Sequence, residues 1–127
     1  MKLALDTNAY TALMRNNARA LEAVRQADEV MIPLIVLAEL RAGFESGTLT
    51  KQNEMRLQQF LNKSSTRILA PDEHTTFHYA HLTRQLRQQG TPIPHNDLWI
   101  AALVIQHDCL LLTSDARFDY LPQIPRR

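Results

Sequence analysis

The sequence lacks several features, and each absence argues against a class of protein. Cys109 is the only cysteine, so no internal disulfide can form, and the leucines that follow it indicate a buried thiol. No apolar run approaches the roughly 20 residues that a membrane-spanning helix needs. Only three apolar residues separate Met1-Lys2 from Asp6, which argues against a signal peptide. We therefore expect a cytoplasmic protein in a reducing compartment, without a membrane partner.

Glycine and net charge are also scarce. The chain has 3 glycines and no glycine-rich phosphate loop, which argues against a nucleoside triphosphatase. Its 14 Lys and Arg against 13 Asp and Glu leave a net charge of +1, so overall charge neither demands nor excludes a nucleic-acid partner. The 127 residues, 45% of them hydrophobic, are enough for one core. We therefore expect a single domain over residues 1–127.

Short apolar runs alternate with helical patterns along the chain. Strands are expected at 3–5, 30–32, 67–70 and 109–113. Helices are expected at 7–16, 18–27, 35–44, 55–61, 72–89 and 98–107, with Leu13, Leu21 and Val24 as core positions. The strands are continuously apolar, which indicates burial on both faces. We predict an α/β fold with a parallel sheet of four to five strands, flanked by helices on both faces.

Four acidic residues fall near the predicted carboxyl ends of strands or in the helices that follow, where such folds usually have their functional site. Asp6 follows the first strand, Asp115 follows the last, Glu39 lies in an apolar helix, and Asp97 stands in the first turn of a later helix. Ligands of open parallel sheets bind beyond the carboxyl ends of the strands. Carboxylates crowded without counter-charge repel one another, and a divalent cation relieves that repulsion. Oxygen ligands alone favour Mg²⁺, with Mn²⁺ as a substitute, over zinc.

Each acid also has an ordinary structural interpretation. Asp6 can cap the helix that follows it, and Asp97 can interact with the dipole of its own helix. Asp115 can belong to a turn, and Glu39 can face solvent. Asp119, a further acid nearby, is interpreted as a surface residue.

The histidines and the single tryptophan are weaker candidates. His74, His78 and His81 share one helix face, but no cysteine or acid completes a zinc site there, so we expect a solvated or packing face. His95 lies close to Asp97 in the sequence and is a candidate contact to a substrate phosphate. Trp99 lies among apolar residues, where packing is the more common role.

Four short motifs occur in order along nearly the whole chain. They are LDTN at 5–8, ELRAG at 39–43, NDLWIAA at 96–102 and TSDARF at 113–118. Together, at these separations, they resemble a PIN-domain ribonuclease, specifically the VapC-like toxin of a type II (VapBC) toxin–antitoxin module. The resemblance implies a PIN-like fold and an acidic metal site formed by Asp6, Glu39, Asp97 and Asp115. It further implies hydrogen-bonding support from Thr7, Asn8, Thr113 and Ser114.

The resemblance also implies a function. The expected activity is that of a Mg²⁺-dependent endoribonuclease toxin, which hydrolyses RNA phosphodiester bonds with a metal-activated water. The expected partners are an RNA substrate, a cognate antitoxin protein and a second copy of the chain in a homodimer. Two alternatives stay open at this point. One is a non-catalytic PIN-like domain that binds RNA or protein. The other is a receiver-like phosphoacceptor domain, although the lysine such domains need after a late strand is missing from Thr113-Ser114-Asp115.

Overall fold

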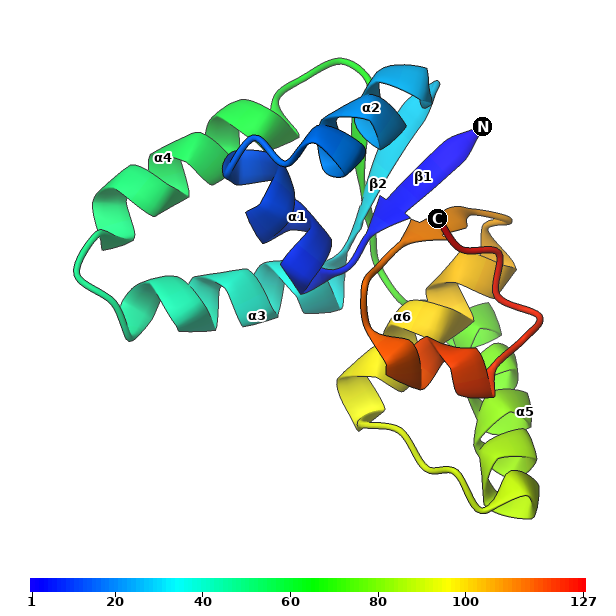
Figure 1. The fold of residues 1–127 in the computed structure, drawn as a ribbon. Coiled ribbons are helices and arrows are strands. Elements are labelled where there is room, and N and C mark those ends of the chain that lie inside the picture. Colours follow the sequence, from blue (N-terminus) through cyan, green and yellow to red (C-terminus); the bar gives the residue numbers. More distant parts are fainter.

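The computed structural model describes all 127 residues, which form a four-stranded parallel sheet between two layers of helices (Figure 1). The strands are β1 (Lys2–Leu5), β2 (Glu29–Pro33), β3 (Thr66–Leu69) and β4 (Leu110–Leu112), in the spatial order β3-β2-β1-β4. In the central strand, Leu3 pairs with Val30 on one side and with Leu110 on the other. The predicted α/β class with a parallel sheet is confirmed.

The sequence predicts four to five strands, and the structure has four. Beyond β4 the chain returns along its outer edge, where Leu111 N donates to Pro125 O at 2.8 Å and Arg127 N donates to Leu111 O at 2.9 Å. This pairing amounts to one bridge between Leu111 and Arg126. The C-terminal segment therefore covers the edge of β4 without forming a fifth strand.

The two helical layers follow from the order of the strands. The connections from β1 to β2 and from β2 to β3 cross the sheet in one direction, whereas the connection from β3 to β4 crosses back. Because such crossovers are right-handed, the helices of the first two connections and those of the third lie on opposite faces (Figure 1). The first layer contains α1 (Thr7–Met14), α2 (Ala18–Gln26), α3 (Leu34–Glu45) and α4 (Thr50–Leu61). The second contains α5 (Glu73–Gln89) and α6 (His95–Gln106), and a short 3-10 helix, η1 (Ala116–Tyr120), follows β4.

Local capping chemistry determines where several helices begin and end. The Asp72 carboxylate accepts from Thr75 N at 3.1 Å, and Thr75 Oγ1 accepts from Asp72 N at 2.9 Å, which together form a capping box. The same helix, α5, ends at Gln89 and is followed by the C-cap Gly90, whose φ of 70° suits glycine. Helix α1 ends at Met14, short of the predicted Asn16, because Asn16 itself has a left-handed φ of 60°.

The core is one continuous cluster of apolar side chains between the sheet and both helical layers. Leu13 is buried in it as predicted, and Val24 packs against it. The prediction for Leu21 is wrong, because its side chain is 37% exposed and α2 instead packs through Ala20 and Ala23. Leu21 follows Ala20 by one position, which rotates it about 100° away from the packed face. No helix of the chain has both the length and the apolar character of a membrane span.

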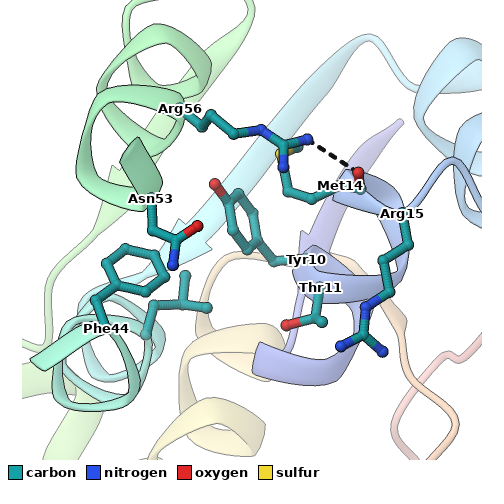
Figure 2. A pocket seen from close by; sticks show the side chains of 8 residues that line it. Tyr10, Thr11, Met14, Arg15, Phe44, Asn53 and Arg56 are labelled. Atoms are coloured by element: carbon teal, nitrogen blue, oxygen red, sulfur yellow. Dashed lines mark hydrogen bonds between the residues drawn. The ribbon is translucent and has the colours of Figure 1, made fainter. Parts of the chain in front are cut away.

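The first helical layer leaves a hollow of about 230 Å³ between α1, α3 and α4 (Figure 2). Tyr10 lines this hollow, its ring packs edge-on against Phe60, and its hydroxyl is buried without a hydrogen-bond partner. Arg56 closes one side by donating to Met14 O at 2.9 Å. None of the four acids singled out in the sequence lines this hollow.

Leu3→Ala tests the central place of β1 in the core. The Leu3 side chain is fully buried, so its truncation leaves a cavity in the core on one face of the sheet. We expect the free energy of unfolding to fall by about 2–5 kcal/mol. Leu21→Ala, at an exposed position, should change it by roughly 0.5 kcal/mol or less. Denaturant titration measures both, and equal losses would contradict this description of the core.

Candidate metal centre

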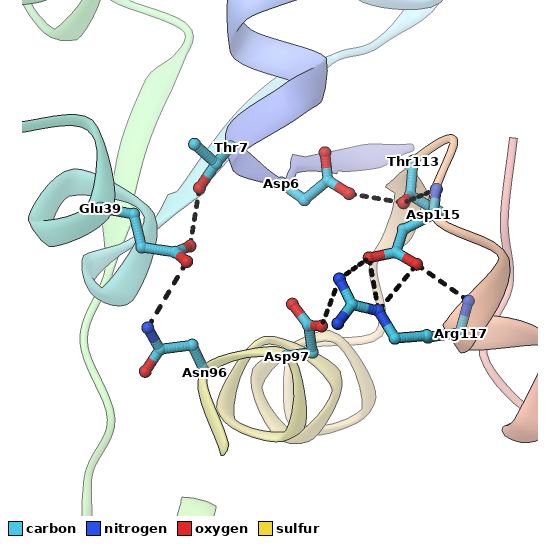
Figure 3. Close-up of polar contacts among 8 residues, drawn as sticks. All are labelled: Asp6, Thr7, Glu39, Asn96, Asp97, Thr113, Asp115 and Arg117. Atoms are coloured by element: carbon cyan, nitrogen blue, oxygen red, sulfur yellow. Dashed lines mark hydrogen bonds and ion pairs between the residues drawn. The ribbon is translucent and has the colours of Figure 1, made fainter. Parts of the chain in front are cut away.

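Four acidic side chains from separate elements point toward one another at the carboxyl end of the sheet (Figure 3). Asp6 follows β1, Asp115 follows β4, Glu39 lies in α3 and Asp97 lies in the first turn of α6. Strands β1 and β4 are neighbours, yet the helices that follow β1 and the helices that precede β4 lie on opposite faces of the sheet. Open α/β sheets bind ligands at such a switch point. The structure thus brings together the four acids that the sequence analysis selected.

Asp6 is buried, with 6% of its surface exposed, and it serves two purposes. Its Oδ1 accepts from Ala9 N at 2.8 Å and caps α1, while its Oδ2 accepts a hydrogen bond from Thr113 Oγ1. Burial raises the pKa of Asp6, although the hydrogen bonds from Thr113 and Ala9 oppose the shift. The charges of Asp115 and Glu39 raise that pKa further. The capping interpretation is therefore confirmed for Asp6, and its role in a metal site stays a prediction.

Glu39 is held by hydrogen bonds at both of its carboxylate oxygens. Thr7 Oγ1 donates to Oε1 at 2.7 Å, and Asn96 Nδ2 donates to Oε2 at 3.4 Å. Figure 3 shows these contacts bridging α3 to the starts of α1 and α6. Asn96 was not among the predicted supporting residues, although it lies next to Asp97 in the NDLWIAA motif.

The predicted supporting residues divide into two groups. Thr7 and Thr113 bond to acids, since Thr113 Oγ1 donates to Asp6 and accepts from Asp115 N at 3.0 Å. Asn8 and Ser114 make no hydrogen bond to any of the acids and instead line an adjacent hollow of about 160 Å³. A direct supporting role for Asn8 and Ser114 therefore stays a prediction.

Asp97 has an oxygen atom without a hydrogen-bond partner. Its side chain is 16% exposed, and its Oδ2 is buried and accepts no hydrogen bond. The Nη2 atom of Arg117 lies 3.7 Å from it, which is too long for a hydrogen bond. Burial is the main cause of a raised pKa for Asp97, and the neighbouring acids add to it while Arg117 opposes it. A buried carboxylate oxygen of this kind is unfavourable unless a proton or a cation satisfies it.

Arg117 is a cation within the acidic group. Its Nε lies 3.1 Å from both carboxylate oxygens of Asp115, and its Nη2 lies 2.8 Å from Asp115 Oδ2. Asp115 also caps η1 by accepting from Arg117 N at 2.9 Å. The guanidinium lowers the pKa of Asp115, and the carboxylate raises the pKa of Arg117. The sequence analysis missed this contact, for which the only signal was the two-residue spacing within TSDARF.

The donor set fits Mg²⁺ or Mn²⁺, but the side chains are not in a coordinating arrangement. All four acids offer oxygen ligands, and the unpartnered Asp97 Oδ2 is aimed at a site where positive charge is favourable. No three acidic, histidine or cysteine groups of the chain are placed to hold one metal ion. Arg117 contacts both Asp97 and Asp115. For three of these acids to share one cation, their side chains have to rotate.

The remaining candidates have structural partners of their own. The Tyr79 hydroxyl lies 2.9 Å from His95 Nδ1, and the Tyr79 ring packs on Trp99 with centroids 4.3 Å apart. Asp119 is an exposed surface residue paired with Arg126, as interpreted from the sequence. Of the three histidines on α5, His74 and His81 are exposed and His78 is half-buried, as expected for a solvated face.

Asp97→Asn tests the cost of the buried charge. After treatment with EDTA at neutral pH, we expect the variant to melt about 3 °C above the wild type, because it lacks the buried, repelled carboxylate. The raised pKa means that the folded wild type binds this proton at a higher pH than the unfolded chain does. Acidification therefore neutralises Asp97 in the folded wild type first, and the difference in melting temperature should shrink.

Asp119→Asn is the matched control, because it removes the same charge from an exposed side chain. Thermal denaturation between about pH 7 and about pH 4.5 measures both variants. A lower melting temperature for Asp97→Asn at neutral pH, or a difference that does not change with pH, would contradict the assignment of a costly charge to Asp97.

Comparison with known proteins gives a consistent family assignment. The family model of the PIN domain matches residues 3–123. The chain is 32% identical over 117 residues to Ribonuclease VapC1 of Haemophilus influenzae, which covers 89% of this chain and 86% of the relative. It is also 32% identical over 125 residues to Ribonuclease VapC2 of Rickettsia felis, covering 94% of this chain and 92% of the relative.

The fold agrees with the sequence comparisons. The crystal structure of VapBC2 from Rickettsia felis, bound to a DNA fragment from their promoter, superimposes with a TM-score of 0.86 at 30% identity. The match covers 100% of this chain and 98% of that one. The motifs, the fold and the full-length similarity lead to one conclusion: the chain belongs to the VapC family of PIN-domain ribonucleases, the toxins of VapBC toxin–antitoxin modules.

Proposed function

We propose that this chain is a Mg²⁺-dependent endoribonuclease whose metal is held by Asp6, Glu39, Asp97 and Asp115. The observation that carries the proposal is the convergence of four carboxylates at the switch point, together with the unpartnered Asp97 Oδ2. PIN domains of the VapC type typically depend on a metal. Donors that are all oxygen support Mg²⁺, with Mn²⁺ as a substitute.

The chain's own residues prepare the site for hydrolysis. A divalent cation supplies an acidified water and neutralises charge on the scissile phosphate. Asp6 is fixed by Ala9 N and Thr113 Oγ1, so its carboxylate is a rigid anchor. Glu39 is oriented from two other elements. Asp6 and Glu39 are therefore ordered before a cation binds, which lowers the entropic cost of holding it.

The placement of the histidines supports water as the nucleophile. Metal-free ribonucleases activate the substrate's own 2′-hydroxyl, usually with two histidines as acid and base. In this chain His95, the histidine closest in sequence to an acid of the site, is hydrogen-bonded to Tyr79. Three of the others lie together on α5, away from the motifs that supply the acids. We therefore assign the chemistry to the carboxylates.

Asp97→Asn tests the site assignment directly. Loss of this carboxylate should reduce cleavage of RNA by roughly 100-fold or more, while circular dichroism shows an intact fold. EDTA should stop the wild-type reaction, and added Mg²⁺ or Mn²⁺ should restore it. The control Asp119→Asn should retain wild-type cleavage. Unchanged cleavage by pure Asp97→Asn would remove Asp97 from the site.

The ends of the RNA products test the proposed nucleophile. Attack by water at phosphorus leaves a 5′-phosphate and a 3′-hydroxyl, and it does not use the 2′-hydroxyl for chemistry. A substrate with one 2′-deoxy substitution at the scissile position should still be cut. Mass spectrometry identifies the termini. A 2′,3′-cyclic phosphate that forms in the presence of EDTA would contradict the mechanism and the roles given to all four acids.

We further propose that the chain acts in the cytoplasm as a homodimer neutralised by a cognate antitoxin. The Rickettsia felis relative was crystallised as a toxin–antitoxin complex, which supports a partner of this kind here. A basic side chain of the antitoxin would complement the acidic group at the sheet's carboxyl end. We expect light scattering of the purified chain to give the mass of a dimer, about twice 14.6 kDa. A strict monomer at high concentration would contradict the dimer.

A further inference from the structure

The positively charged Arg117 side chain forms ion pairs with two of the four acids, Asp97 and Asp115. Its guanidinium contacts Asp115 through Nε and Nη2, and the same Nη2 is the closest cationic atom to the unpartnered Asp97 Oδ2. Figure 3 shows the guanidinium lying between these two carboxylates. One positive group therefore partly neutralises two of the four acids of the proposed metal site.

The Arg117 side chain can move away from the two acids into solvent without disturbing the fold. It is 52% exposed, and its side-chain polar contacts are confined to Asp97 and Asp115. The backbone around it is anchored separately, because the neighbouring Phe118 is buried in the core. A swing of the side chain into solvent costs these ion pairs but no core packing.

We propose that Arg117 is a positioning residue that competes with the divalent cation for Asp97 and Asp115 and so lowers the protein's affinity for metal. The inference rests on the proposed metal site. Its physical basis is charge: a guanidinium and a divalent ion repel each other when both stand within about 4 Å of the same carboxylate. The fork on Asp115 also occupies both carboxylate oxygens that a metal would use.

Two possible roles of Arg117 predict opposite effects of its removal on metal affinity. If Arg117 only stabilised the acidic group, its removal would leave the carboxylates disordered, and metal affinity would stay equal or fall. If Arg117 competes with the cation, its removal frees two ligands and metal affinity rises. Direct measurement of metal binding therefore distinguishes competition from a purely structural role.

The experiment measures Mn²⁺ binding to the purified chain by electron paramagnetic resonance, in which free Mn²⁺ gives a signal that binding removes. We expect Arg117→Gln to bind Mn²⁺ about fivefold more tightly than the wild type, the effect of losing one partly exposed ion-pair partner. Arg25→Gln is the matched control, because Arg25 is also exposed and paired with an acid, on α2. Its Mn²⁺ affinity should equal that of the wild type.

Melting temperatures provide a second readout. In EDTA, Arg117→Gln should melt below the wild type, because the acids have lost their counter-charge. Mg²⁺ at one high concentration should raise its melting temperature by more than it raises that of the wild type, because stabilisation by a ligand grows with the logarithm of its affinity. Arg117→Met, which keeps a long side chain without the charge, repeats both measurements and replaces Arg117→Gln if that variant fails to fold.

The outcomes separate this inference from the proposed function. Tighter Mn²⁺ binding by the Arg117 variants, with an unchanged control, supports competition. Equal or weaker binding overturns the inference while leaving the metal site in place. An absence of Mn²⁺ binding in the wild type and in every variant overturns the metal site itself, and with it this inference.

Discussion

The electrostatic repulsion between four converging carboxylates is the constraint on which the rest of the site depends. Parallel pairing of β1 and β4 brings Asp6 and Asp115 to one edge of the sheet, and α3 and α6 add Glu39 and Asp97. Left alone, such a group would protonate or separate. In this structure each acid has a different set of polar partners. Asp6 is hydrogen-bonded, and Glu39 is held by Thr7 and Asn96. Asp115 is paired with the guanidinium of Arg117, whereas Asp97 Oδ2 accepts no hydrogen bond and lies 3.7 Å from that guanidinium.

The elements that build the fold also orient the site. Asp6 caps α1 and Asp115 caps η1, so two acids are fixed by the backbone amides of the segments that follow them. Thr113 joins the two by donating to Asp6 and accepting from Asp115 N. A helix cap normally contributes about 1 kcal/mol to stability. Here the same hydrogen bonds also determine where charge is placed, so the stability of the fold and the geometry of the site cannot be varied independently.

Apolar runs and motif spacing were enough to predict the parallel sheet, its two helical layers and the convergence of four acidic side chains. Strands that are apolar throughout have few alternatives to burial between helices, and acids that directly follow such strands have a fixed position. Leu21 was mispredicted because one helix can pack through small residues, and Ala20 and Ala23 present the buried face of α2. The contacts of Asn96 and Arg117 depend on side-chain reach across elements, which sequence spacing does not encode.

The two edges of the sheet differ in whether another polypeptide strand can pair with them, because the C-terminal segment covers the edge of β4. Its backbone hydrogen bonds with Leu111 cover the outer edge of β4, so no further strand can add there without displacing residues 125–127. The opposite edge, β3, has a strand neighbour only on its β2 side. Ile68 on that strand is 48% exposed, while Arg67 beside it is charged, a common safeguard against edge-to-edge aggregation. Any association by β-strand addition is therefore confined to the edge of the sheet that lies farthest from β4 and from the acid that follows it.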